Sequence, residues 1–311
     1  MTKHLSSSVN VPKIFVIGKN GQVGWELQRS LSMLGDVIAL SRYEADLQAP
    51  QALLERIRME RPDVIVNAAA YTAVDKAEVD EVAATQINGV AVGELAQAAR
   101  DAGALFIHYS TDYVFDGSKN GPYVESDEPN PQNAYGRSKL AGERAIQQAG
   151  GDWLVLRTTW VYAARGHNFM KTMLRLARER DELRVVGDQY GVPTWARMIA
   201  EATAIIVARA MQARTRGEFA SGIYHLSAGG ATTWHSFAEL IVGYARQHER
   251  SGSIKASVVT PILTADYPLP ACRPVNSILS CEKLRCDYGI VMPAWDVAAE
   301  LCLADLLECN G

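Results

Sequence analysis

The chain has 311 residues, of which 48% are hydrophobic and 21% charged, a balance that is ordinary for a globular protein of one or two lobes. Lys and Arg total 31 against 35 Asp and Glu, so the formal charge is −4, which argues against a nucleic-acid binder because such proteins carry basic patches. No apolar run approaches the ~20 residues that span a bilayer, and the polar segment Met1 to Lys13 lacks the core of a secretion signal.

The cysteines all lie in the last forty or so positions. They are five in number, an odd count, and no C-x-x-C or paired His ligands accompany them, which argues against both a zinc site and a disulfide scaffold. We therefore expect no metal, reduced thiols without a catalytic role, and a cytoplasmic location. The five are Cys272, Cys281, Cys286, Cys302 and Cys309.

Short apolar runs alternate with helical segments through the first half of the chain. The runs are too short for helices and are typical of buried parallel strands. Such alternation predicts right-handed βαβ units, and hence an α/β fold with a doubly wound, Rossmann-like parallel sheet. The expected strands are 14–17, 37–40, 63–66, 105–110 and 153–157, and the expected helices are 25–31, 51–59, 81–100 and 135–148.

The second half is less regular. Prolines cluster between 261 and 274, which indicates a loop-rich segment before a last helix. We expect a first domain over 1–165 with return segments from about 195–226, and a smaller lobe mainly over 166–311. The helices expected there are 169–180, 199–211, 234–247 and 295–307, with a strand at 183–186 and a possible returning strand at 223–226.

Three glycines form the spacing G-x-x-G-x-x-G between the first strand and the first helix: Gly18, Gly21 and Gly24. Glycine permits a tight turn and a close approach of the backbone to a pyrophosphate, and the free N–H groups of the helix N-terminus then face that anion. The alternative is a tight βα turn without a ligand. In its strand–turn–helix context the motif predicts a dinucleotide site.

Ser41 and Arg42 directly follow the second expected strand. An NAD site normally places an acid there to bind the ribose 2′-OH, whereas a hydroxyl and a guanidinium suit a 2′-phosphate. This favours NADPH over NADH, although NADH stays possible and Arg42 could instead be a solvated charge.

Tyr135 and Lys139 lie four residues apart on a predicted helix, so both project from one face. A nearby ammonium favours the phenolate and lowers the pKa of a tyrosine, which otherwise lies near 10. Thr111 and Asp112 follow a predicted strand, at the sheet edge where ligands bind. The alternative for Tyr135 and Lys139 is an exposed helix pair.

The glycine turn, the strand-end Thr111 and the Tyr135/Lys139 pair occur in the order typical of the short-chain dehydrogenase/reductase superfamily. Longer strings make the resemblance closer: the chain resembles the dTDP-4-dehydrorhamnose reductase family, in the extended branch of that superfamily, over nearly its whole length. The strings span 18–27, 67–75, 110–117, 135–143, 157–162, 188–194, 228–230 and 273–277.

The resemblance implies roles for particular residues. Tyr135 would give a proton to the C4 ketone of a sugar nucleotide as hydride arrives from the nicotinamide. Lys139 would hold the nicotinamide ribose and lower the pKa of Tyr135, while Thr111 would bond the reacting oxygen beside Asp112. Further cofactor contacts would be Gly21, Gln22 and Val23 at the pyrophosphate, Asp46 and Leu47 at the adenine, and Ala70, Tyr71 and Thr72 along the groove.

Two residues would contact the substrate. The resemblance implies Trp160 at the sugar, and Arg273 is our own choice for the diphosphate, because arginine binds phosphate in a bidentate way. Trp160 could instead fill the core, Arg273 could be a solvated loop charge, and Asp46 could be a helix cap. His108, His167, His225 and His235 show no metal-ligand spacing, and we interpret them as non-catalytic.

The resemblance has one departure that concerns oligomers. Some members bridge two subunits through a metal held by carboxylates, one of them shortly after a Gly-x-Pro-Thr string. Here that position is Arg197, which would repel a divalent cation. A metal-bridged dimer is therefore not expected, and a monomer or a different homodimer stays open.

The function that these features imply is NADPH-dependent reduction of dTDP-4-dehydro-β-L-rhamnose to dTDP-β-L-rhamnose, the last step of a pathway that supplies lipopolysaccharide, another glycan or an antibiotic. One alternative is another reductase or epimerase of the same branch. A dehydratase of that branch is disfavoured. Such enzymes have Asp-Glu after the strand-end hydroxyl, whereas here Asp112 is followed by Tyr113. Another alternative is a non-catalytic regulatory subunit, which need not keep Tyr135 and Lys139.

Overall fold

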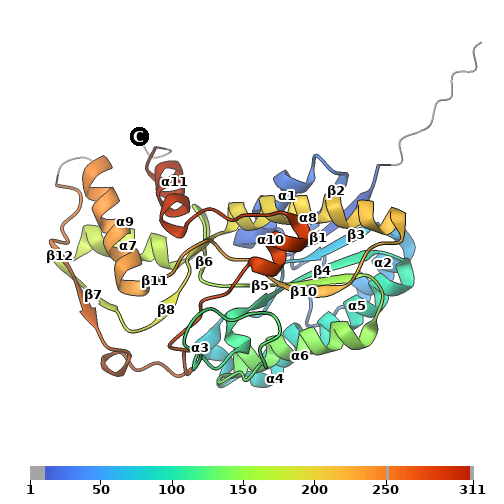
Figure 1. Ribbon diagram of the computed structural model, residues 1–311, viewed down its shortest axis with the longest axis horizontal. Helices are drawn as coiled ribbons and strands as arrows, with labels where there is room; N and C mark the ends of the chain where they lie inside the picture. Colours follow the sequence, from blue (N-terminus) through green and yellow to red (C-terminus); the bar gives the residue numbers. More distant parts are fainter. Residues whose placement is uncertain (1–10, 250–251, 309–311) are drawn as a thin grey trace, which may run out of the picture.

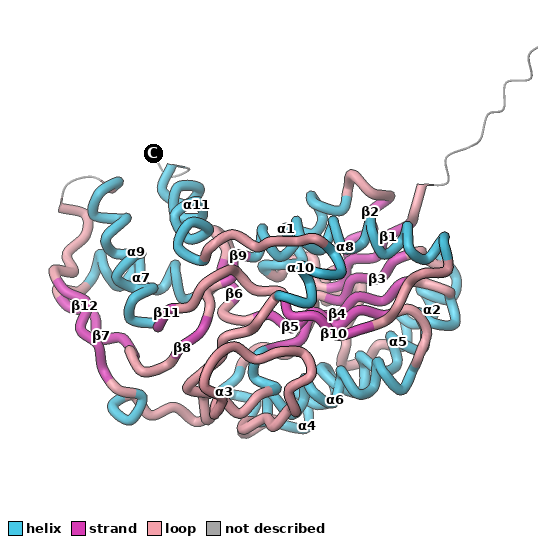
Figure 2. Tube along the Cα trace, viewed as in Figure 1, coloured by secondary structure: helices cyan, strands magenta, loops and turns pink. Residues whose placement is uncertain are grey.

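A six-stranded parallel sheet forms the centre of the larger lobe (Figures 1 and 2). The computed structural model describes residues 11–249 and 252–308, so most of the segment Met1 to Lys13, as well as Cys309, lies outside it. In sheet order the strands are β10 (Gly222–His225), β5 (Trp153–Thr158), β4 (Leu105–Thr111), β3 (Val64–Asn67), β1 (Lys13–Ile17) and β2 (Asp36–Leu40). From β1 the chain turns to one side for β2 and then to the other for β3, which creates a switch point, the place where ligands bind in such sheets.

Helices cover both faces of the sheet, as Figure 1 shows. One face carries α1 (Gln22–Leu31) and α8 (Ala196–Arg216); the other carries α2 (Gln51–Glu60), α5 (Ala91–Ala102) and α6 (Ala134–Ala149). The central strands β1, β3, β4 and β5 are covered by helices on both faces, so nearly all their residues are buried and their sequences are nearly continuously apolar. The doubly wound α/β prediction is confirmed.

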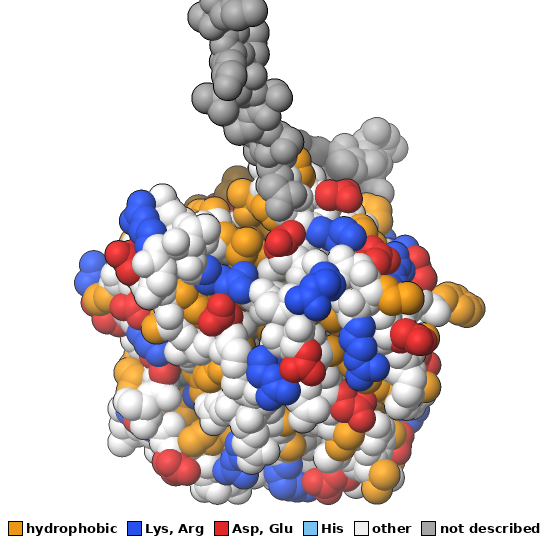
Figure 3. Space-filling view, turned by 90° about the vertical axis from the view of Figure 1, so that its right-hand side faces the viewer, with side chains coloured by type: hydrophobic (Ala, Val, Ile, Leu, Met, Phe, Trp, Pro, Cys, Tyr) orange, Lys and Arg blue, Asp and Glu red, His pale blue; other side chains and the backbone are white. Residues whose placement is uncertain are grey.

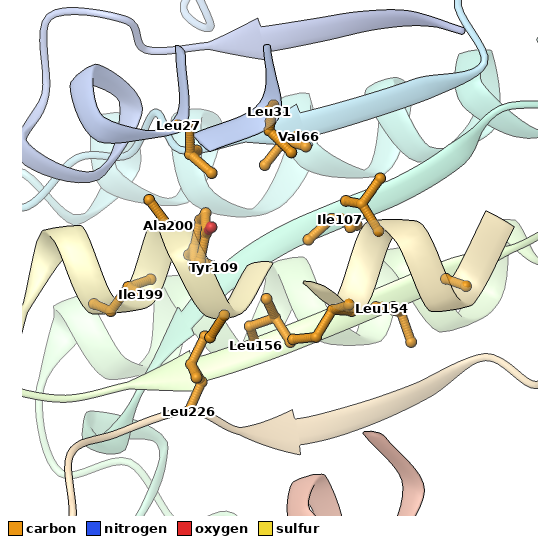
Figure 4. Close-up of a cluster of buried hydrophobic side chains, with 14 of the residues drawn as sticks. Leu27, Leu31, Val66, Ile107, Tyr109, Leu154, Leu156, Ile199, Ala200 and Leu226 are labelled. Atoms are coloured by element: carbon orange, nitrogen blue, oxygen red, sulfur yellow. The ribbon is translucent and has the colours of Figure 1, made fainter. Parts of the chain in front are cut away.

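The core between the sheet and α8 joins distant parts of the chain. Figure 4 shows Leu27 and Leu31 of α1 and Ile199 and Ala200 of α8 against side chains of the strands. A third helix, α10 (Glu282–Tyr288), packs its Leu284 and Tyr288 into the same core. The sequence did not predict α10, whose seven residues follow a proline-rich stretch.

The smaller lobe has its own apolar core, formed by three helices and one pair of strands. They are α7 (Phe169–Glu179), α9 (Trp234–His248), α11 (Trp295–Glu308), β7 (Glu182–Val186) and β12 (Val258–Ile262). Two further pairs of two-residue strands lie between the lobes (Figure 2). They are β6 (Val161–Tyr162) with β9 (Thr194–Trp195), and β8 (Tyr190–Gly191) with β11 (Thr232–Thr233). The sequence predicted none of these two-residue strands, nor β12.

One long predicted helix differs in detail. The segment 81–100 consists of α4 (Glu81–Thr85), a single π-helical turn (Gln86–Val90) and α5. A short helix, α3 (Val74–Ala77), precedes it. Single π-helical turns often lie at functional sites, and this one borders the cavity described below.

The face of the larger lobe that lies away from the smaller lobe carries positive and negative side chains intermixed, without a field of one sign (Figure 3). Among residues 11–249 and 252–308, no helix is both long and apolar enough to cross a bilayer. The four cysteines in this part of the chain are free thiols, and Cys302 is buried in the core of the smaller lobe.

Candidate active site

The glycine turn connects β1 to α1 with the geometry that a pyrophosphate site needs. Gly18 has a φ of +91°, and a Cβ on it would lie 2.8 Å from the nitrogen of Ala69. A Cβ on Gly24 would lie 2.1 Å from the carbonyl oxygen of Gly18, so this glycine lets the helix pack closely on the strand. Gly21 caps α1 without a side-chain hydrogen bond, which leaves the first N–H groups of the helix for an anion.

A cavity of about 620 Å³ opens from this turn along the carboxyl ends of the strands. Its walls include twelve of the predicted cofactor residues: Gly18, Gly21, Gln22, Val23, Arg42, Asp46, Leu47, Ala70, Tyr71, Thr72, Tyr135 and Lys139. Two others, Gly24 and Ser41, are not among the lining residues. The glycine-rich end and Arg42 suit a phosphorylated dinucleotide, and Asp46 is the only carboxylate among the described lining residues.

The loop after β2 contains a carboxylate, Glu44, beside the predicted phosphate-binding residues Ser41 and Arg42. Glu44 accepts hydrogen bonds from the backbone N–H and the hydroxyl of Ser41, both at 2.8 Å, and from Lys19 at 2.9 Å. Hydrogen bonds from Ser41 and Lys19 lower the pKa of Glu44 to about 2. Arg42 reaches Gln48 at 2.9 Å but is largely exposed, so its guanidinium is the cation at this end of the cavity that is accessible to a 2′-phosphate.

Tyr135, which is partly buried, lies with the buried Thr111 and Asp112 where β4 ends and α6 begins. The Thr111 hydroxyl donates to one carboxylate oxygen of Asp112 and the Thr159 hydroxyl to the other, each at 2.9 Å. Burial, and next the charge of Asp112, raise the pKa of Tyr135, while a hydrogen bond with Thr111 acts in the opposite direction. The phenol is therefore protonated at neutral pH and can serve as a proton donor.

Asn133 places Tyr135 in the first turn of α6. Its side chain accepts a hydrogen bond from the N–H of Gly136 at 2.8 Å and so caps the helix. Its amide nitrogen donates to the carbonyl of Cys272 at 2.8 Å, which attaches the proline-rich loop to the start of the helix.

Lys139 does not contact Tyr135 in this structure. Its Nζ lies 2.9 Å from Nε2 of His108 and donates to the carbonyl of Tyr109 at 2.6 Å. Burial lowers the pKa of Lys139 to about 7. The groups that shift the pKa of Tyr135 do not include Lys139, so the lowering of that pKa by Lys139 stays a prediction for the cofactor-bound enzyme.

Asn88, in the π-helical turn, was not identified from the sequence. Its side chain accepts from the N–H of Tyr71 at 2.8 Å, donates to the carbonyl of Tyr71 at 3.0 Å and donates to the Ser138 hydroxyl at 3.0 Å. It thereby fixes the loop that lines the cavity against α6. Other lining residues that the sequence analysis did not assign to the cofactor are Asn20, Ala45, Ala68, Ala69, Ile87, Tyr109, Ser110, Thr158, Val161, Gly166 and His167.

Trp160 lies where the two lobes meet, in a strained conformation. Its φ is +44°, in the left-handed region that non-glycine residues rarely adopt and that is often found at functional sites. Its indole stacks on Trp234 with 3.5 Å between ring centroids. A Cβ on Gly191 would lie 2.3 Å from this indole, so only glycine fits at that position of β8.

Arg273 is held near Tyr135 by two partners. It forms an ion pair with Asp75 at 2.8 Å and donates to the hydroxyl of Tyr113 at 3.0 Å. The ring of Tyr113 in turn packs edge-on against that of Tyr135. Arg273 is thus not a solvated loop charge.

Arg197 lies between two carboxylates. Its guanidinium is 2.6 Å from Asp305 and 3.6 Å from the buried Glu26. Glu26 also forms an ion pair with Arg29 at 2.9 Å, so arginines of this chain lie beside both carboxylates. Among residues 11–249 and 252–308, no cluster of three or more acidic, His or Cys side chains could hold a metal.

Comparison with known proteins identifies relatives along the full length of the described chain. The model of the RmlD substrate binding domain family matches residues 12–308. The dTDP-4-dehydrorhamnose reductase of Burkholderia thailandensis is 56% identical over 296 residues, covering 95% of this chain and 99% of the relative. That of Escherichia coli K12 is 45% identical over 303 residues, covering 96% of this chain and 99% of the relative.

Solved structures of similar proteins support the same relationship. The dTDP-4-dehydrorhamnose reductase of Bacillus anthracis in complex with NADP has a TM-score of 0.85 at 32% identity, covering 95% of this chain and 99% of that one. The UDP-glucose 4-epimerase of Thermus thermophilus, in complex with NAD, has a TM-score of 0.78 at 20% identity, with 95% and 99% coverage. At that identity the second likeness shows the fold alone.

Proposed function

The chain belongs to the dTDP-4-dehydrorhamnose reductase family, and from that membership we infer that it is an NADPH-dependent oxidoreductase of dTDP-rhamnose synthesis. Its reaction is reduction of the C4 ketone of dTDP-4-dehydro-β-L-rhamnose to dTDP-β-L-rhamnose. The observation that carries the proposal is the position of Tyr135 at the wall of the glycine-lined cavity, in a chain 56% identical to a reductase of that name.

NADPH, when bound, supplies the hydride that adds to C4. Tyr135 gives its phenolic proton to the ketone oxygen, which completes the alcohol. In this structure the Thr111 hydroxyl donates a hydrogen bond to Asp112. When the substrate is bound, the same hydroxyl would donate to the ketone oxygen instead and orient it. General acid catalysis of this kind typically contributes a factor of about 10²–10⁴.

The cofactor would lie with its pyrophosphate on the N–H groups of Gln22 and Val23 and its 2′-phosphate at Arg42. Support comes from the uncapped start of α1 and from the exposed guanidinium at the same cavity. Asp46 and Leu47 would contact the adenine, and Lys139 the nicotinamide ribose.

The sugar nucleotide would lie between the lobes. We assign the sugar to Trp160 and Asp112, and the diphosphate to Arg273. Arg273 then shares its guanidinium between the diphosphate and Asp75, and the strain at Trp160 supports a role beyond packing. We place the enzyme in the cytoplasm, as a monomer or a homodimer without a metal bridge.

A coupled assay tests the proposal. The purified protein is mixed with NADPH and the dTDP-4-keto sugar, generated in place by the preceding enzymes, while the nicotinamide absorbance is followed and the product identified. We expect NADPH oxidation and dTDP-β-L-rhamnose. Turnover of a different keto sugar, with none on this one, would contradict the assignment.

A further inference from the structure

Asn67, His108 and Lys139 form a buried polar chain beside the cofactor cavity, and the mechanism above gives no task to the first two. The chain runs from β3 through β4 to α6, and the three residues are 1%, 0% and 2% exposed. Asn67 Nδ2 lies 3.1 Å from Nδ1 of His108, and Nε2 of the same ring lies 2.9 Å from Nζ of Lys139.

The backbone fixes the direction of these hydrogen bonds. The side-chain oxygen of Asn67 accepts from the N–H of Ala69 at 3.1 Å, so the amide nitrogen is the group that faces His108. An amide nitrogen only donates, and therefore Nδ1 of His108 is the acceptor and carries no proton. A neutral imidazole then carries its proton on Nε2.

The proton on Nε2 points at Lys139. An ammonium has three donors and no acceptor, so it would set a donor against a donor at 2.9 Å. An uncharged amine has one lone pair, which accepts from Nε2 of His108 while an N–H donates to the carbonyl of Tyr109. The hydrogen bonds are thus satisfied only when Lys139 is neutral.

The electrostatic surroundings agree with a neutral Lys139. Burial lowers its pKa to about 7, and Glu143, which acts in the opposite direction, is itself held by Arg157 through two hydrogen bonds of 2.7 and 2.9 Å. Burial, the largest cause, holds the pKa of His108 well below its usual value, so the imidazole is neutral. The other ionisable groups on the elements that carry His108 and Lys139, and on the turn Asp112–Val114 that follows β4, are Tyr109, Asp112, Tyr113 and Tyr135, together with Arg137 and Arg144 on α6.

We propose that His108 is a positioning residue that stores Lys139 as an uncharged amine in the cofactor-free enzyme, and that NADPH binding draws Lys139 away from His108 with uptake of one proton. The inference rests on the proposed function, which places Lys139 at the nicotinamide ribose. The phosphates of the cofactor favour the charged form of Lys139, and the ribose hydroxyls and the Tyr109 carbonyl accept from its three N–H groups. The proton comes from solvent, and no covalent bond changes.

Calorimetry of NADPH binding measures the proton directly. Titrations in two buffers of the same pH and different ionisation enthalpy give the number of protons taken up. We expect about one at about pH 8.5, where Lys139 is neutral before binding, and an affinity that falls up to about tenfold per pH unit above about pH 7. The 2′-phosphate titrates near pH 6 and does not contribute there. An uptake of zero protons at about pH 8.5 overturns the proposal.

Two variants reverse the direction of the hydrogen bonds. Asn67→Asp keeps the acceptor for Ala69 but replaces the amide donor with an acceptor, so the proton moves to Nδ1 and Nε2 can accept from an ammonium. His108→Gln can present its side-chain oxygen to the ammonium. Both should lose proton uptake at about pH 8.5 and the pH dependence of NADPH affinity. The matched control is His225→Gln, a buried histidine of β10, which should keep the wild-type uptake. Wild-type uptake in the first two variants overturns the proposal.

A spectroscopic measurement needs no variant. Long-range ¹⁵N–¹H correlation of the cofactor-free protein reports the tautomer of His108, and we expect the proton on Nε2. A proton on Nδ1 contradicts the proposal that His108 stores Lys139 as an uncharged amine.

The two proposals fail in different ways. NADPH binding without proton uptake overturns this inference alone, whereas failure to bind NADPH or to oxidise it with the keto sugar overturns the proposed function.

Discussion

The cofactor side and the substrate side of the site are built differently. On the cofactor side, the glycine turn and the ends of β1 and β3 are adjacent in the sheet, and each residue is positioned by the strand or helix on which it lies. On the substrate side, Trp160 is fixed by Gly191 and Trp234, and Arg273 by Asp75. Regular elements thus position the cofactor, whereas contacts between distant loops position the sugar nucleotide. Variants on the two sides should therefore separate in NADPH affinity and in KM for the sugar.

Tyr135→Phe is expected to have the largest effect. It removes the proton donor and leaves the ring in contact with Tyr113, so kcat should fall by about 10²–10⁴-fold with nearly unchanged NADPH affinity. Single-turnover kinetics with the keto sugar and fluorescence titration with NADPH measure the two quantities. Full activity in this variant would show that another group supplies the proton.

Gly191→Ala tests the substrate side. The added methyl would lie 2.3 Å from the indole of Trp160, so the ring must shift from its stack on Trp234. We expect KM for the sugar to rise, NADPH affinity to stay constant and the free energy of unfolding to fall by about 1–3 kcal/mol. Gly243→Ala, where a Cβ meets nothing within 4 Å, is the matched control. A change in NADPH affinity would break the separation between the two sides.

Arg42→Ala tests the cofactor side. Loss of a charge-assisted contact to the 2′-phosphate should weaken NADPH binding about tenfold while NADH binding changes little. Arg58→Ala, on α2, is a control for the loss of one positive charge. Equal losses for both cofactors would mean that Arg42 does not contact the 2′-phosphate, and Lys19 would be the next residue to test.

The sequence predicted the regular elements better than the contacts between them. Apolar runs such as 14–17 and 105–110 revealed the buried strands, because a strand buried on both faces has no polar alternation. The two-residue strands β8 and β11 have no such pattern, since their pairing depends on segments about forty residues apart. For the same reason Asp75 was not identified as the partner of Arg273, which lies 198 residues away.

Local chemistry at the site was also incomplete in the sequence. Ser41 and Arg42 were read as a phosphate site, but Glu44, three residues beyond Ser41, occupies the Ser41 hydroxyl. The sequence does contain a signal for this contact, because a carboxylate three residues after a serine can accept hydrogen bonds from that serine's N–H and hydroxyl. His108 shows no sequence signal, because its importance comes from Asn67 and Lys139, which only the fold brings together.

Arg197 provides the smallest expected effect and the sharpest control. Because Arg197 pairs with Asp305, and Arg29 and Arg197 lie beside Glu26, a chelator should change neither kcat nor the molar mass in solution. Arg197→Glu would replace the cation with a third carboxylate beside the other two. Without metal this variant should be less stable, because like charges approach with Glu26 partly desolvated. Addition of Mg²⁺ should raise its Tm, since carboxylate oxygens are hard ligands for this ion, and should leave the wild-type Tm unchanged. A Mg²⁺-dependent Tm in the wild-type protein would show that Arg197 does not take the place of a metal.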